Sequence, residues 1–93
     1  LNISPDLVTS TIQLDNANLK IVLKNALDVV IDTADDGSDA PFAGDNSSPK
    51  KSMERNSSPG DGAVSGSWHS AITSVNLDPT ASESATPKAA NGL

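Results

Sequence analysis

The sequence predicts a mainly β chain with a small antiparallel meander near its start. Apolar and charged residues alternate along residues 19–33, LKIVLKNALDVVIDT, with the period of a strand that has one apolar face. The run Val29-Val30-Ile31 is β-branched, which also favours a strand. We therefore expect meander strands at about 8–14, 19–24 and 28–33. A further strand is expected near 64–77, with a long irregular loop before it and an extended tail after it.

The spacing of charges in this block predicts the register of a hairpin. With Asn25-Ala26-Leu27 as the loop, Lys and Asp side chains face each other on one side, and apolar residues match on the other. The predicted cross-strand pairs are Lys24 with Asp28, Val22 with Val30, Lys20 with Asp32, Leu23 with Val29, and Ile21 with Ile31. A turn at residues 15–18, DNAN, would add the first strand, with Leu14 opposite Leu19 and Ile12 opposite Ile21.

A single amphipathic helix over about 16–34 is the alternative interpretation. Most of its apolar residues fall on one side of a helical wheel, Asp15 or Asn16 could cap its start, and Gly37 could end it. Ile21 and Ile31 would lie on the polar side of that helix. We favour the meander because the hairpin register matches residues on both of its faces at once.

Composition divides the chain into four segments. Residues 1–34 form the N-terminal β block, and 35–62 form a flexible loop rich in Gly, Pro, Ser and Asp. Residues 63–77 hold the strand that is expected to lay Trp68 over the meander, and 78–93 form the tail. Trp68 and Phe42 are the only aromatic residues, so the chain has little material for a core of its own.

Charge and composition bear on several function classes. A net charge of −6 argues against binding to nucleic acid or to an anionic membrane. The absence of cysteine removes disulfides, thiolate nucleophiles and Cys-based zinc sites. No apolar run reaches the length of a spanning helix, and the start lacks the features of a signal peptide. The first residue is Leu1, as expected of a processed product or of a domain excerpt. The sequence does not indicate a cellular compartment.

An acidic run, DTADDGSD at residues 32–39, has some of the spacing of a calcium loop. Ala34 and Ala43 occupy the third and twelfth positions, where that loop needs oxygen ligands. We therefore predict no metal site, but a solvated acidic turn with at most weak cation binding. Its carboxylates are Asp32, Asp35, Asp36 and Asp39.

Catalytic chemistry has few candidates in this chain. His69 is the only histidine, and the neighbouring Ser67 and Ser70 come with no orienting carboxylate nearby in sequence, so a polar strand residue is expected. The segment VVIDTADDGS resembles the apolar-Asp-Thr-Gly signature of aspartic proteases over a few residues, with Ala34 in place of the glycine. We predict that the chain is not an enzyme and binds no cofactor. The enzymatic alternative is a fragment that contributes Asp32 to a shared active site.

Two Ser-Pro steps and one Thr-Pro step punctuate the loop and the tail. Ser48, Ser58 and Thr86 are the candidate modification sites, since each precedes a proline. A phosphorylation-regulated disordered linker of a larger protein is therefore the alternative function.

The favoured function is a non-enzymatic structural or interaction polypeptide that completes a larger assembly, such as a capsid, a fibre or a multisubunit complex. Its partners would be other protein subunits, in a homo- or hetero-oligomer, because a lone meander leaves one apolar face open. The predicted interaction residues are Ile12, Leu14, Ile21, Leu23, Val29, Ile31 and Trp68.

Overall fold

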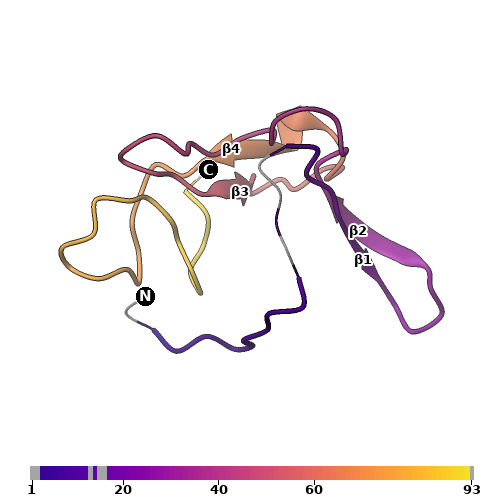
Figure 1. The fold of residues 1–93 in the computed structure, drawn as a ribbon, viewed down its shortest axis with the longest axis horizontal. Helices are drawn as coiled ribbons and strands as arrows, with labels where there is room; N and C mark the ends of the chain where they lie inside the picture. Colours follow the sequence, from indigo (N-terminus) through magenta and orange to yellow (C-terminus); the bar gives the residue numbers. More distant parts are fainter. Residues whose placement is uncertain (1–2, 13, 15–16, 93) are drawn as a thin grey trace.

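Two small antiparallel sheets make up the regular structure of the chain (Figure 1). The computed structural model describes residues 3–12, 14 and 17–92. Strand β1 (Ile21–Lys24) pairs with β2 (Val30–Ala34), and β3 (Met53–Arg55) pairs with β4 (Trp68–Ser70). The helical content of the described residues is one 3-10 turn, η1 (Ser65–Ser67). The mainly β prediction is confirmed, and the alternative helix over 16–34 is not supported.

The turn of the β1–β2 hairpin is built by Asn25. Its side-chain Oδ1 accepts hydrogen bonds from the backbone N–H groups of Leu27 (2.9 Å) and Val29 (3.1 Å). Its own N–H donates to the Val29 carbonyl at 2.9 Å. Asp28 closes the loop with a φ of 64°, a left-handed conformation that Asp adopts more readily than most residues. This gives a three-residue loop, Ala26-Leu27-Asp28, instead of the predicted Asn25-Ala26-Leu27.

The predicted register of this hairpin is wrong. The observed partners are Ile21 with Ala34, Val22 with Thr33, Leu23 with Asp32, and Lys24 with Val30, with a bulge between the last two pairs. The Asn25 turn fixes this register, because matching exposed charges across two strands is worth too little to override turn geometry. Lys24 and Asp28 still form an ion pair at 3.3 Å, across the turn and not between strands.

The first predicted meander strand is absent from the described part of residues 8–14. Thr11 donates its backbone N–H to the Thr9 hydroxyl at 3.2 Å, a local bond that competes with strand pairing. Part of the predicted turn, residues 15 and 16, lies outside the described residues. Ile12 and Leu14 therefore do not extend the hairpin.

Strand β3 lies inside the segment predicted as loop, and β4 is hydrogen-bonded to it and not to the hairpin. Residues predicted as one strand over 64–77 divide into η1, the three residues of β4, and irregular chain. Two cross-strand pairs explain the partnership, since Glu54 faces His69 and Arg55 faces Trp68. The strand near 64–77 is predicted from its apolar residues, which do not indicate these polar pairs.

The C-terminal segment runs along the free edge of β3 and does not extend away from the chain. Ser52 N–H donates to the Ser84 carbonyl at 3.0 Å, and Ser84 N–H donates to the Lys50 carbonyl at 3.0 Å. Val75 N–H donates to the Ala85 carbonyl at 3.0 Å, which ties the preceding loop to the same segment. The yellow end of the chain accordingly lies close to β3 and β4 in Figure 1.

Burial of apolar side chains is slight. Ala71 is the one buried hydrophobic residue among those described. The radius of gyration, 13.9 Å, exceeds the value of about 12 Å expected for a compact domain of this length. No helix among residues 3–12, 14 and 17–92 has the length and apolarity to cross a membrane.

Candidate functional site

The hairpin joins the second sheet through Arg55. Its guanidinium donates two hydrogen bonds to the Asp32 carboxylate, each 3.0 Å long, and two more to the carbonyls of Pro59 (2.7 Å) and Gly60 (2.9 Å). The hydrogen bond from Arg55 is the largest cause that lowers the pKa of Asp32 below its ordinary value. Asp32 is therefore ionised at neutral pH, with both carboxylate oxygens occupied, and serves here as the anchor of β2.

Trp68 and Gly62 complete this junction. The Arg55 guanidinium lies 4.9 Å from the centre of the Trp68 ring, within the range of a cation–π interaction. The Trp68 indole N–H donates to the Gly62 carbonyl at 2.8 Å, and that carbonyl also accepts the Asp35 N–H at 3.0 Å. Trp68 is thus linked to the base of the hairpin through Gly62 and Arg55, and it borders a cavity of about 120 Å³ together with Ile21 and other residues of β1 and β2.

Beyond this anchored base, the β1–β2 hairpin extends away from β3 and β4 (Figure 1), and its large apolar side chains are exposed. The exposed fractions of its large apolar residues range from 39% for Val22 to 83% for Leu27. All of the predicted interaction residues on the hairpin belong to this exposed set, namely Ile21, Leu23, Val29 and Ile31. Ile12 and Leu14 are exposed in the N-terminal segment, apart from the sheet, and Trp68 is half-buried at the junction.

A buried polar cluster lies on the second sheet, centred on Glu54. The Glu54 carboxylate accepts hydrogen bonds from the Thr86 hydroxyl (2.6 Å) and the Gly92 N–H (3.3 Å), and lies 3.1 Å from His69 Nε2. The other imidazole nitrogen, Nδ1, lies 2.6 Å from Asn56 Oδ1. Both nitrogens of His69 therefore face oxygen acceptors, and the cluster ties the C-terminal segment to β3 and β4.

Ionisation of Glu54 follows from these contacts. Burial acts to raise the pKa of the carboxyl group, but the hydrogen bonds from Thr86, Gly92 and His69 outweigh it and hold the pKa below the ordinary value. A buried carboxylate is retained in a protein when donors surround it. Because its oxygens and both imidazole nitrogens are already engaged, the arrangement is that of a structural network.

The four predicted acidic residues do not converge on one point. Asp32 binds Arg55, and Asp36 accepts hydrogen bonds from the Ser38 N–H and hydroxyl. Asp35 is fully buried and accepts the backbone N–H of Phe42 at 2.8 Å, so it organises the loop after β2. Within the described residues, no three His, Asp or Glu side chains are arranged to hold a metal ion.

The three candidate modification sites differ in accessibility. Ser48 and Ser58 are exposed in irregular segments before and after β3. Thr86 is 7% exposed, and its hydroxyl is bonded to Glu54. A kinase can therefore reach the two serines in this structure, whereas Thr86 requires the C-terminal segment to detach.

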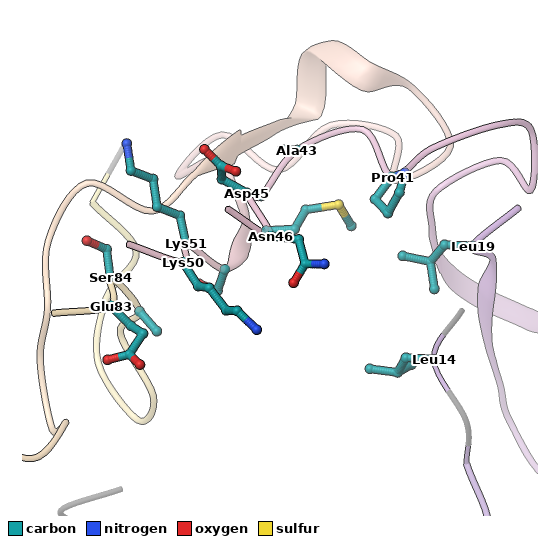
Figure 2. Close-up of a pocket in the computed structure, with 14 residues that line it drawn as sticks. Leu14, Leu19, Pro41, Ala43, Asp45, Asn46, Lys50, Lys51, Glu83 and Ser84 are labelled. Carbon is teal, nitrogen blue, oxygen red and sulfur yellow. The ribbon is translucent and has the colours of Figure 1, made fainter. Parts of the chain in front are cut away.

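An open groove of about 440 Å³ lies beside β3 (Figure 2). Leu14, Leu19 and Pro41 line one side, and Glu83 and Ser84 line the other, with Lys50 extending between the two sides. Among the described residues, no carboxylate forms an ion pair with Lys50 or Lys51. The groove therefore combines an apolar wall with a polar one, and Lys50 reaches into the space between them.

The sequence analysis did not identify Glu54, Arg55 and Gly62, which organise the junction with the hairpin and the buried polar cluster. They lie in the segment predicted as a flexible loop, and the pairing of Met53-Glu54-Arg55 with Trp68-His69-Ser70 is too short to leave a periodic signal in the sequence. Comparison with known proteins found no matching family model, no matching curated protein and no matching solved structure.

Proposed function

We propose that this chain is a non-enzymatic structural or interaction polypeptide that completes a larger protein assembly, with the β1–β2 hairpin as its contact element. The observation that carries the proposal is the contrast between the exposed apolar hairpin and the single buried apolar residue among those that the structure describes, Ala71. Groups of exposed large apolar side chains on a soluble protein often mark an interaction site.

The physics of a two-stranded sheet supports the same function. An isolated hairpin is marginally stable in water, and it gains stability when another strand or surface buries its side chains. Here the base of the hairpin is fixed by the contacts of Asp32 with Arg55 and of Asp35 with Gly62. The hairpin is thus held out from the second sheet, with its tip available to a partner.

The test is light scattering after size exclusion, with far-UV circular dichroism, on the whole chain and two double variants. We expect concentration-dependent association that Leu27→Ser with Ile31→Ser weakens. The matched control, Val64→Ser with Ile72→Ser, changes two exposed apolar residues outside the hairpin and should associate like the parent. A monomeric, cooperatively folding parent chain would contradict the proposal.

A phosphorylation-regulated linker is the second candidate, supported by the exposure of Ser48 and Ser58 in irregular segments, each before a proline. Mass spectrometry of the chain from its natural source tests this second function by measuring phosphate on Ser48 and Ser58. Phosphate on either serine would favour it, and unmodified serines under all conditions would count against it.

A further inference from the structure

The outer edge of β1 carries no partner strand among the described residues. The Thr33 carbonyl points away from β1, because it lies close against Gly62. Val22 is the cross-strand partner of Thr33, so its backbone N–H and C=O also face away from the hairpin. The Asn25 N–H donates to the Val29 carbonyl across the hairpin. Because the N–H and C=O groups of successive strand residues face opposite edges, those of Lys24 face outward, as those of Val22 do.

The other edge of the hairpin is partly closed. Gly62 lies against the Thr33 carbonyl, and its own carbonyl accepts the Asp35 N–H at 3.0 Å, so the loop between β3 and η1 already covers the end of β2. An additional strand can therefore join this sheet along β1.

Side chains along β1 define what such a strand must present. Lys20 and Lys24 flank Val22 on one face, and all three are exposed. Ile21 and Leu23 lie on the other face, where they border the cavity of about 120 Å³ next to Trp68. The ion pair of Lys24 with Asp28 is exposed and readily exchanged for another carboxylate.

We propose that β1 accepts an antiparallel strand from a partner protein, in which two acidic residues four positions apart enclose three apolar residues. The carboxylates would lie opposite Lys20 and Lys24, and the apolar residues opposite Ile21, Val22 and Leu23. Main-chain hydrogen bonds supply affinity in this mode of recognition, and the alternating side chains supply specificity. This inference rests on the proposed function and names the chemistry of the partner.

A second folded copy of the chain fits this edge poorly. Two β1 strands paired about Val22 would place Lys20 opposite Lys24 twice, and like charges opposite each other are destabilising. The segment DVVID at residues 28–32 has the required pattern, but the folded chain uses it in the turn, the bulge and the Asp32–Arg55 pair. A free peptide with that sequence is therefore a suitable probe.

The experiment measures the fluorescence anisotropy of a labelled peptide of residues 26–34, ALDVVIDTA, titrated with the whole chain. We expect saturable binding that weakens as salt rises from about 50 to 500 mM. Lys20→Glu with Lys24→Glu should weaken binding by about tenfold or more. The control, Lys50→Glu with Lys51→Glu, makes the same change in net charge away from β1 and should leave binding within about twofold.

Val22→Pro tests the backbone part of the proposal. Proline removes an N–H that faces away from β2, so we expect it to abolish peptide binding while circular dichroism keeps the signal of the parent chain. Equal binding of a peptide with both aspartates changed to lysine would overturn the inference, as would full binding by the Val22→Pro variant.

Two further outcomes separate this inference from the proposed function. Association of the chain that depends on Leu27 and Ile31, with no binding of the peptide, would overturn the β1 assignment and leave the proposed function standing. Self-association that Val22→Pro abolishes would identify a second copy as the occupant and overturn the assignment to a partner protein.

Discussion

Glu54 and His69 face each other across β3 and β4, with 3.1 Å between Glu54 Oε2 and His69 Nε2. Their contact is the centre of a network that reaches the C-terminal segment through Thr86 and Gly92. Because apolar burial is slight elsewhere in the described chain, this polar network is a main source of order in the second sheet.

Replacing Glu54 by Gln tests that role. The neutral Gln side chain lacks the charge that strengthens three hydrogen bonds. Its NH2 group would also face groups that donate hydrogen bonds to Glu54 in the parent chain. We expect the free energy of unfolding to fall by about 1–3 kcal/mol, measured by urea denaturation. The control is Glu83→Gln, which removes the same charge from an exposed side chain and should change stability little. Equal stability of both variants would contradict the structural role.

Acid should destabilise the chain through the same carboxylate. The pKa of Glu54 is lowered in the folded state, so below its ordinary pKa of about 4.3 the unfolded state binds protons more readily than the folded state. The stabilisation is fully present above that pH and is lost as the pH falls through the folded-state value. Urea midpoints at a series of pH values should therefore fall more steeply for the parent than for Glu54→Gln. Parallel curves would contradict this prediction.

Gly62 is expected to tolerate no side chain. A Cβ at this position would lie 1.6 Å from the Thr33 carbonyl oxygen, a backbone atom that cannot move without shifting β2. Gly62→Ala should lower the free energy of unfolding by about 1–3 kcal/mol. It should also alter the fluorescence of Trp68, because the indole N–H donates to the Gly62 carbonyl. Gly66→Ala is the control, because a Cβ there meets nothing within 4 Å. If both variants unfold at the same urea concentration, the packing described for Gly62 is wrong.

Arg55→Lys separates charge from geometry at the junction. Lysine keeps the positive charge, but it cannot donate two parallel hydrogen bonds to Asp32 or stack its head group flat over the Trp68 ring. Asp32 is partly exposed, so the loss of stability should be modest, about 1 kcal/mol or less. Emission from Trp68, the only tryptophan, should nevertheless shift. An unchanged spectrum would show that the guanidinium contact is unimportant.

The sequence predicted strands at β1 and β2 because alternation and β-branching act within a few residues. It failed on their register, since the Asn25 side chain and the left-handed Asp28 set the turn, and both effects outweigh the weak pairing of exposed charges. Of the pairs predicted between residues 20–24 and 28–32, the chain keeps the exposed Lys24–Asp28 ion pair across the turn but not the strand register. The same complementary pattern therefore remains available to describe an external strand.

Strand β3 could not be found by the same reasoning. Three residues are too few for a periodic pattern, and their partner in β4 lies more than a dozen residues away across a Gly- and Pro-rich segment. The pairing depends on the contacts of Glu54 with His69 and of Arg55 with Trp68, which only become visible once the strands are side by side. Tertiary contacts of this kind leave little trace in local sequence.

The order in which a proline-directed kinase modifies the chain tests whether the C-terminal segment is held in place. Ser48 and Ser58 are exposed, whereas the Thr86 hydroxyl is buried against Glu54. In the folded chain we expect Thr86 to be phosphorylated at least about tenfold more slowly than Ser48, because local opening must come first. A free peptide of residues 82–92 should remove that protection, and mass spectrometry over a time course measures both rates. Comparable rates for Thr86 in the chain and in the peptide would mean that the segment is not docked on β3.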